Sequence, residues 1–315
     1  MKSKLIYISL ILFLFASSAK ALEMPVSVLQ MPSSGNVMAE MSGVSAEAYL
    51  VVDAQSGQIL ISKNADEQWT PASLTKLITA LVVLDTNPNL NQSVTMSKAD
   101  QVAGYCTSGG ACIKTASGVK FSLDGLFHAA LIPSANNAAN ALARSTGLST
   151  ADFAQKMNDK VASLGATSSH FYEPTGMNPQ NKITASDYAK IAVAAFSNPY
   201  IRKTAGLSNY TLKSVNNSKY NQTIKNTNAL LTDPDISVLA AKTGYLNESG
   251  YNFSSLVQSF GGQQFIVVVL GERHLSNAFK ETKQLTALGL ATKILALGQT
   301  SGAVLGASTV LGTNN

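Results

Sequence analysis

The stretch "PASLTKLITALVVLD", residues 71–85, sets a serine and a lysine three positions apart at the start of an apolar segment. Apolar residues recur at helical spacing after Pro71, which the first turn of a helix tolerates because no N–H is needed there. The pattern therefore predicts a helix that Thr70 caps, with Ser73 in its first turn. Side chains three apart lie on one helix face, so the amine of Lys76 can reach the hydroxyl of Ser73.

A serine with an amine beside it can serve as a nucleophile with its base. A serine hydroxyl is too weakly acidic to attack a carbonyl at neutral pH, whereas an unprotonated lysine can take its proton as the bond forms. The positive end of the helix would also favour negative charge at Ser73. The same spacing occurs at Ser17 with Lys20 and at Ser117 with Lys120. The alternative, the polar edge of a buried helix, therefore stays open until other parts of the chain are considered.

The N-terminus has the pattern of a secretory signal peptide. Two lysines precede an apolar run from Leu5 to Ala16, and the small residues Ala19 and Ala21 form a cleavage-like site, so residues 1–21 are expected to be removed. The run is too short to span a bilayer comfortably, and we expect no retained transmembrane anchor.

Length and composition indicate a folded protein with one sizeable core or two lobes that share a cleft, since 45% of its 315 residues are hydrophobic. Removal of the three signal-peptide lysines lowers the formal charge from +5 to +2. No basic stripe remains, so we expect no nucleic-acid partner. Two cysteines and three scattered histidines predict no metal site. In an exported protein Cys106 and Cys112, which bracket "TSGGA", are expected to form a disulfide.

The chain divides into segments of different composition. Residues 22–45 are expected to be a flexible linker. A strand hairpin is predicted from Ala46, in "AEAYLVVDAQSGQILISKN", and residues from about 89 to 205 are predicted to be mostly helical. Three strands then follow in "VLAAKTGY", "YNFSSLVQSF" and "QFIVVVLGE", before a helix over about 276–297. The tail, residues 298–315, is low in charge and rich in Gly, Ser and Thr, so we expect it to be disordered.

Strands on both sides of a helical segment can complete a single sheet. The chain is therefore predicted to be an α/β protein, with one domain over residues 46–297 into which the helical lobe is inserted. The cleft between the sheet and this lobe is the natural place for a site.

Two further short motifs carry groups suited to such a site. "SAN" puts Ser134 and Asn136 between two predicted helices, and "KTG" puts Lys242, Thr243 and Gly244 on a strand. A hydroxyl and an amide can relay a proton and hold a substrate amide, while the strand can offer an edge, an ammonium and a hydroxyl to a carboxylate.

With S-x-x-K at a helix start, S-x-N in a loop of the helical lobe and K-T-G on a strand, in that order, the sequence resembles the penicillin-binding proteins. It is most similar to the low-molecular-mass D-alanyl-D-alanine carboxypeptidases and the related endopeptidases. The resemblance covers residues 46 to about 297 and includes "EPTGMNPQN" and "NTNALL". It implies a β-lactamase/transpeptidase-like fold, an antiparallel sheet flanked by helices with the active site in the cleft beside the inserted lobe.

The resemblance implies an acyl-enzyme mechanism on peptidoglycan stem peptides that end in D-Ala-D-Ala. Ser73 would attack the bond between the two D-alanines with Lys76 as base, and Ser134 would pass the proton toward the leaving amine. Asn136 would orient the substrate amide. β-Lactam antibiotics would be covalent inhibitors, no cofactor would be needed, and a monomer in the bacterial periplasm or another extracytoplasmic cell-wall space is expected.

The K-T-G strand would hold the other end of the substrate. By the same resemblance, Lys242 and Thr243 would bind the terminal carboxylate, and the backbone N–H groups of Ser73 and Tyr245 would form the oxyanion hole. Lys242 would also bias Lys76 toward its neutral form by like-charge repulsion.

Several alternatives accompany this prediction. No glycine begins a G-x-S-x-G elbow, which removes the main support for a Ser-His-Asp hydrolase. A β-lactamase would need a deacylating glutamate, for which Glu173 is a candidate, although a turn residue is the plainer interpretation. An inactive peptidoglycan-binding module would need no nucleophile. The motifs do not separate a carboxypeptidase, our first expectation, from an endopeptidase that cuts peptide cross-links, because both use the same acyl-enzyme.

Two departures from the family pattern also bear on the expectation. Ala135 stands in the middle of the second motif, where the family often has glycine, and a loop can usually absorb this change. After the K-T-G strand and its hairpin the sequence continues with one helix and a tail, without the C-terminal β-domain and amphipathic anchor of the larger carboxypeptidases. A membrane-attached form is therefore not expected.

Overall fold

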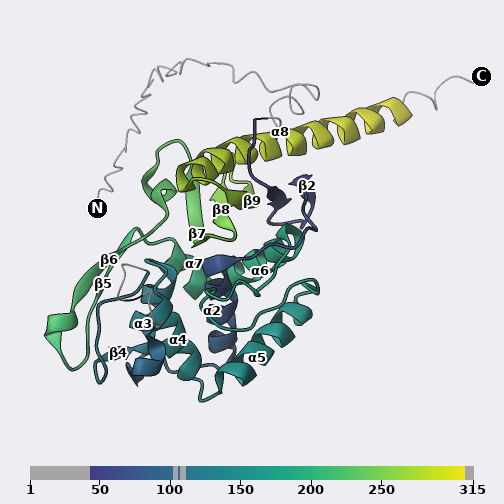
Figure 1. Ribbon diagram of the computed structural model, residues 1–315. Coiled ribbons are helices and arrows are strands. Elements are labelled where there is room, and N and C mark those ends of the chain that lie inside the picture. Colours follow the sequence, from purple (N-terminus) through teal and green to yellow (C-terminus); the bar gives the residue numbers. More distant parts are fainter. Residues whose placement is uncertain (1–42, 102–105, 107–110, 309–315) are drawn as a thin grey trace, which may run out of the picture. The chain divides into compact units, whose positions relative to one another are not determined.

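The computed structural model describes residues 43–308, except for 102–105 and 107–110 (Figure 1). The predicted signal peptide and most of the predicted linker lie outside the described residues. Among the helices that are described, none is both long and apolar enough to cross a membrane.

A five-stranded antiparallel sheet forms the centre of the fold (Figure 1). Its two ends in sequence come together in space, because the first strand pairs with the last one along its whole length. This confirms the prediction that strands on either side of the helical lobe complete a single sheet. In spatial order the strands are β2 (Ile59–Lys63), β1 (Ala48–Asp53), β9 (Gln264–Glu272), β8 (Gly250–Gln258) and β7 (Ser237–Leu246).

The strand residues alternate between two apolar cores, one on each face of the sheet. Leu50 of β1 packs toward the helical lobe, while its neighbours Tyr49 and Val51 pack toward the C-terminal helix α8 (Leu275–Ser308). Successive side chains of a strand point to opposite faces, so a sheet that is covered on both faces has almost continuously apolar central strands. The run "FIVVVL" in β9 is buried throughout for this reason.

The helical lobe packs on the face opposite α8 (Figure 1). Side chains cap three of its helices, as polar residues at helix starts commonly do: the Ser122 side chain accepts a hydrogen bond from the Gly125 N–H, and Ser149 and Thr184 cap the helices that follow them. The α-helices on this side are α2 (Thr75–Asp85), α3 (Leu123–Leu131), α4 (Asn136–Arg144), α5 (Thr150–Ser163), α6 (Ala185–Ser197) and α7 (Pro199–Ala205).

Short elements connect these parts. Two small two-stranded sheets were not predicted from the sequence: β3 (Ser93–Thr95) with β4 (Lys120–Ser122), and β5 (Asn209–Leu212) with β6 (Gln222–Lys225). The 3-10 helices are η1 (Ala72–Leu74), η2 (Lys98–Asp100), η3 (Ser218–Tyr220) and η4 (Ala229–Thr232).

The structure differs from two expectations about the ends of the domain. Ser45, assigned to the flexible linker, donates hydrogen bonds from its hydroxyl to Glu272 and Glu281, each at 2.8 Å. The chain is therefore fixed before Ala46, because α8 and β9 supply carboxylates that sequence patterns do not reveal. At the other end α8 continues to Ser308, so the backbone over 298–308 is helical where disorder was expected.

Candidate active site

Ser73 lies in the 3-10 turn η1, directly before α2, and not inside the first turn of an α-helix as predicted. Thr70 does not cap this turn, since its hydroxyl donates to the Pro179 carbonyl at 3.1 Å. Ala72, the residue before the serine, has φ +51°, in the left-handed region that non-glycine residues rarely occupy. The backbone that presents the serine is therefore held in place by its surroundings.

β7 passes close to this turn. A Cβ atom on Gly244 would lie 2.8 Å from the Pro71 carbonyl oxygen and 3.2 Å from the Ser73 nitrogen, so only glycine lets the strand pass here. This contact brings the K-T-G motif against the S-x-x-K motif, although the two are far apart in sequence.

Lys76 is almost completely buried, with 1% of its surface exposed. Its Nζ lies 2.7 Å from the Ser73 Oγ, 2.7 Å from the Asn136 Oδ1 and 2.6 Å from the Thr175 carbonyl oxygen. Two of these three partners can only accept hydrogen bonds. A neutral amine would donate its two protons to them, and its lone pair would then face the Ser73 hydroxyl.

The protonation of Lys76 follows from its surroundings. Burial lowers its pKa to about 7, against a smaller opposing effect of Glu173 that raises it. A substantial fraction of the amine is therefore neutral near pH 7, as a general base requires.

Ser134 and Lys242 form the second half of the site. The Lys242 Nζ donates to the Ser134 Oγ at 2.7 Å and to the Thr243 carbonyl at 2.9 Å. Ser134 has φ +65°, so this serine too is held in a strained backbone conformation. Burial, and then repulsion from Lys76, hold the pKa of Lys242 well below its usual value. Repulsion between the lysines thus lowers the pKa of Lys242, whereas the low pKa of Lys76 comes from burial. The expected bias of Lys76 toward its neutral form by Lys242 is therefore replaced by the effect of burial.

The hydroxyl of Thr243 makes a contact that the sequence did not reveal. Its Oγ1 lies 2.6 Å from the Oγ1 of Thr227, an exposed residue of the segment "NTNALL". Two adjacent hydroxyls share one hydrogen bond, so one of them keeps a proton for another acceptor. The next residue along β7, Tyr245, is 49% exposed and packs its ring on Tyr251.

The Thr175 carbonyl belongs to a turn that Glu173 organises. The Glu173 carboxylate accepts hydrogen bonds from the N–H groups of Thr175 and Gly176, each at 2.7 Å. It also accepts from the Asn178 N–H at 3.3 Å and from the Asn181 side chain at 2.9 Å. The structure therefore supports the interpretation of Glu173 as a turn residue. Sequence reasoning missed the Thr175 carbonyl because any residue carries a backbone carbonyl.

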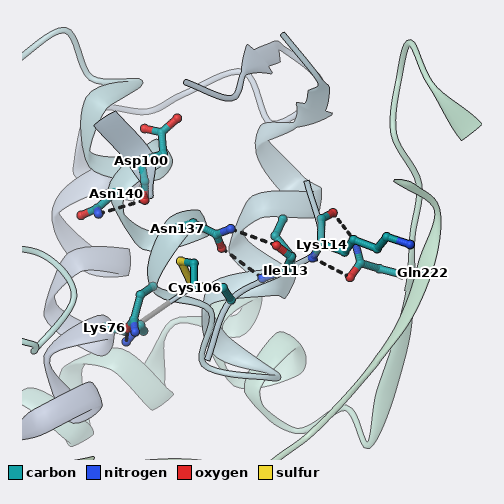
Figure 2. Close-up of a disulfide and its surroundings, with 10 residues drawn as sticks. Lys76, Asp100, Cys106, Ile113, Lys114, Asn137, Asn140 and Gln222 are labelled. Atoms are coloured by element: carbon teal, nitrogen blue, oxygen red, sulfur yellow. Dashed lines mark hydrogen bonds between the residues drawn. A yellow bond between two sulfur atoms is a disulfide. The ribbon is translucent and has the colours of Figure 1, made fainter. Parts of the chain in front are cut away.

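The start of α4, which carries Asn136, is fixed by the segment that contains the cysteines (Figure 2). The predicted disulfide between Cys106 and Cys112 is confirmed. The Asn136 N–H donates to the Ala111 carbonyl at 2.6 Å. Asn137 makes two hydrogen bonds to the backbone of Ile113, at 3.0 and 3.1 Å.

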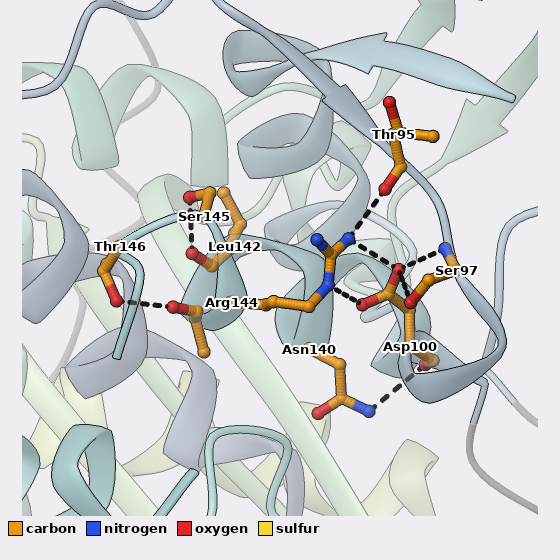
Figure 3. A network of polar contacts seen from close by, with 9 residues as sticks. Thr95, Ser97, Asp100, Asn140, Leu142, Arg144, Ser145 and Thr146 are labelled. Carbon is orange, nitrogen blue, oxygen red and sulfur yellow. Dashed lines mark hydrogen bonds and ion pairs between the residues drawn. The ribbon is translucent and has the colours of Figure 1, made fainter. Parts of the chain in front are cut away.

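The far end of α4 is held by a buried carboxylate (Figure 3). Asp100 is 1% exposed and accepts from the Arg144 Nε at 2.8 Å and Nη2 at 2.9 Å. The same carboxylate accepts from the Ser97 N–H, and Asn140 donates to the Asp100 carbonyl. Charge-assisted pairs of this geometry are strong and directional, so α4 is anchored at both ends.

Comparison with known proteins identifies the family of this site. A family model described as D-alanyl-D-alanine carboxypeptidase matches residues 35–274. The chain belongs to the D-alanyl-D-alanine carboxypeptidase family. It is therefore a serine peptidase, a hydrolase of the low-molecular-mass penicillin-binding protein type that acts on peptidoglycan, as the sequence predicted.

Individual relatives agree with this assignment. The chain is 34% identical to a D-alanyl-D-alanine endopeptidase of Haemophilus influenzae, over 66% of this chain and 68% of that protein. It is 32% identical to a D-alanyl-D-alanine carboxypeptidase of Mycobacterium tuberculosis, over 71% and 74%. The solved Streptomyces K15 DD-transpeptidase superposes with a TM-score of 0.73 at 28% identity, over 79% of this chain and 98% of that one, which confirms the predicted transpeptidase-like fold.

The described residues bring the predicted side chains of this carboxypeptidase-family protein into one place. Lys76 joins Ser73 to Asn136, Lys242 joins Ser134 to Thr243, and β7 lies against the serine turn. Within the part of the chain that the structure describes, no group of three or more His, Cys, Asp or Glu residues is placed to hold a metal ion.

Proposed function

We propose that the protein cleaves D-alanyl peptide bonds of peptidoglycan through an acyl-enzyme on Ser73. The observation that carries this proposal is the environment of Lys76, which is buried and hydrogen-bonded to two acceptor-only oxygens beside the Ser73 hydroxyl. A buried amine in that arrangement is a base, whereas a structural lysine would be paired with a carboxylate.

In the first step the Ser73 Oγ attacks the carbonyl carbon of the D-alanyl bond while its proton moves to the Lys76 Nζ. The C–N bond then breaks, and the proton held by Lys76 passes to the leaving amine through the Ser134 hydroxyl, which Lys242 holds in place, so Lys76 is neutral again. In the second step water attacks the ester and gives a proton to Lys76, and this proton returns to the Ser73 Oγ as the ester C–O bond breaks. The acyl-enzyme thus divides one difficult reaction into two easier steps.

The oxyanion of the tetrahedral intermediate needs donors. The backbone N–H groups of Ser73 and Tyr245 are the proposed pair, and the close passage of β7 past the Ser73 nitrogen at Gly244 supports this. Such donors contribute roughly 3 kcal/mol each to transition-state stabilisation. β7 is also an edge strand of the sheet, with β8 as its one partner in the order of strands, so an extended peptide can pair with it.

The carboxylate of the substrate is assigned to Lys242 and Thr243. A bound carboxylate would favour the ammonium form of Lys242, whose pKa is low in the absence of an anion. The hydroxyl pair of Thr243 and Thr227 offers a further donor at the same position.

The finer specificity is proposed to be that of an endopeptidase, which cuts D-alanyl cross-bridges. Relatives from Haemophilus influenzae, Pseudomonas aeruginosa and Escherichia coli carry that name. Trimming of a terminal D-alanine, the activity first expected from the sequence, is the second candidate, because the matching family model and the mycobacterial relative are described as carboxypeptidases.

Digestion of defined muropeptides separates these candidates. The purified protein is incubated with a monomeric pentapeptide and with a cross-linked dimer, and product masses are measured, with Ser73→Ala as the control. Conversion of dimer to monomers shows an endopeptidase, and loss of one alanine from the pentapeptide shows a carboxypeptidase. No product from either substrate would contradict the proposal, and rapid nitrocefin turnover would indicate a β-lactamase.

The proposal also covers inhibitors and location. Penicillin-Binding Protein D2 from Listeria monocytogenes, 27% identical with a TM-score of 0.67, has been solved in an ampicillin-bound form. We expect β-lactams to acylate Ser73 here as well. Export through the N-terminal segment to the periplasm, as a monomer, is the accompanying expectation, and fractionation of cells that produce the protein would test it.

A further inference from the structure

The turn over residues 173–178 contacts the proposed base and the serine turn together. The Thr175 carbonyl accepts from Lys76, and the Pro174 carbonyl accepts from the Thr79 hydroxyl of α2 at 2.7 Å. Gly176 has φ +86°, and a Cβ there would lie 1.8 Å from the Ala72 carbonyl oxygen. The turn is thus wedged between α2 and η1, so any movement of it displaces the groups on either side of Ser73.

We infer that Glu173 is a positioning residue for Lys76: its carboxylate holds the Thr175 carbonyl against the lysine amine and so directs the amine lone pair at Ser73. This inference rests on the proposed function. Both carboxylate oxygens are occupied, Oε2 by the N–H and hydroxyl of Thr175 and Oε1 by the N–H of Gly176 and other donors. Glu173 is therefore not free to activate water, which separates this role from that of a deacylating base.

The charge of Glu173 matters as well as its shape. Five donors converge on it, and only an ionised carboxylate can accept from all of them without offering a proton of its own. The charged groups that face Lys76 are Glu173 from this turn and Lys242 from β7, while Asn136 of α4 is neutral. Burial lowers the pKa of Lys76 and Glu173 partly opposes this, so the carboxylate raises the pH at which the base becomes active.

Glu173→Gln tests the inference because it keeps the size and removes the charge. The expected result is a roughly 10- to 100-fold lower rate of acylation by a fluorescent penicillin, since the amine loses its orientation. The acidic limb of the rate–pH profile should also move to lower pH, because loss of the carboxylate lowers the pKa of Lys76. A merely structural role would lower the rate without moving this limb.

Three further variants separate the effect of the Glu173 charge from the effect of the hydrogen bonds in the turn. Thr175→Val removes a hydrogen bond of the turn but keeps the carboxylate, so its rate should fall while its limb stays near that of the unchanged protein. Glu67→Gln makes the same chemical change at an exposed site and should change neither the acylation rate nor the position of the acidic limb. Glu173→Asp keeps the charge at a greater distance and should shift the limb less than Glu173→Gln. If Glu173→Gln does not fold, judged by circular dichroism, Glu173→Asp replaces it with the same expected direction.

A second readout does not depend on acylation. The pKa of Lys76 is measured in the ligand-free protein by NMR of lysines labelled with ¹³C at Cε, with Lys76→Ala to assign the signal. A lower Lys76 pKa in Glu173→Gln, with the matching shift of the limb, supports the inference. An unchanged Lys76 pKa overturns it, whatever the rate. Failure of the unchanged protein to react with penicillin would instead contradict the proposed function, and the NMR titration would still decide the role of Glu173.

Discussion

The two lysines of the site and the lysines of α8, which lie on opposite faces of the central sheet, differ in their partners. On the lobe face Lys76 and Lys242 are each 1% exposed, and neither forms an ion pair among the described residues. On the α8 face Lys293 is paired with the buried carboxylate of Asp53, and Lys283 is paired with Asp233. The site also contains strained backbone, because Ala72 and Ser134, which both have positive φ, lie on the lobe face.

This fold separates the groups that stabilise it from the groups that carry out the chemistry. A buried amine without a carboxylate to pair with destabilises the folded state when it is charged, and its pKa falls until it is partly neutral. Pairing it would restore stability but would remove the lone pair that a base needs. On the α8 face, Lys293 pairs with Asp53 of β1 and Lys283 with Asp233, and these pairs hold the helix against the rest of the domain. Proteins commonly depart from the rules of stable packing at functional sites, and the lobe face does so.

Replacing one lysine from each face should give the largest contrast. Lys76→Ala removes the proposed base and should slow acylation by benzylpenicillin by roughly 10²- to 10⁴-fold. Lys293→Ala removes a lysine that is paired on the other face and should leave the rate within a factor of about two, since an ion pair beneath α8 contributes to stability only. Equal losses in the two variants, measured by stopped-flow with a fluorescent penicillin, would remove the distinction between the faces.

The rate of acylation should depend on pH in a way set by Lys76. Its pKa of about 7 means that the amine is increasingly neutral above that pH and protonated below it. The rate should therefore rise with pH through about 7, and fall by about tenfold for each pH unit below it. A rate that is flat between pH 5 and 8 would show that the neutral amine is not the base.

Loss of the ion pair on the α8 face should lower the stability of the folded protein. Burial would raise the pKa of Asp53, but hydrogen bonds from Lys293 and from Ser56 and Gln55 overcome this and lower it from 3.8 to about 2. Because the pKa of Asp53 is lower in the folded protein than in the unfolded chain, its ionised carboxylate stabilises the fold at every pH above about 4. That stabilisation is lost as the pH falls through about 2. Asp53→Asn should therefore lower the free energy of unfolding by about 2 kcal/mol at pH 7.

Urea denaturation at pH 7 measures the effect of Asp53→Asn. The acylation rate of the folded variant should match that of the unchanged protein, because Asp53 lies on the face away from the site. A variant that keeps its stability but loses activity would contradict the division between the faces.

Much of this architecture could be predicted from the sequence. The Ser73 and Lys76 spacing, the cap at Ser122 and the apolar strand runs are local signals, and local signals suffice where a helix or strand forms as its own pattern dictates. The disulfide between Cys106 and Cys112 was also predictable from spacing and export.

The rest depends on contacts between distant segments. The 3-10 turn at Ser73 forms where β7 passes at Gly244, and nothing near residue 73 indicates that strand. The Thr175 carbonyl is a backbone group, so no residue type marks it as a partner of Lys76. Ser45 is fixed by the carboxylate of Glu281, which is remote in sequence, so the residues around Ser45 do not indicate that the chain is held there.

Truncation of α8 should have the smallest effect. The side chains of Ile294 and Leu297 are exposed, and the ion pair of Lys293 with Asp53 precedes them. Removal of residues 298–315 should leave the acylation rate unchanged and the melting temperature within a few degrees. A large fall in either would show that this segment contributes to the folded domain.

The proposed mechanism depends on acylation of Ser73 with Lys76 as its base. The most direct measurement is peptide mapping by mass spectrometry after incubation with benzylpenicillin. The peptide that contains residues 71–76 should gain the full mass of the antibiotic, because a strained lactam opens on the serine and stays attached. Ser73→Ala should show no adduct while it keeps its fold. An adduct on another serine, or undiminished labelling of Ser73→Ala, would contradict the account.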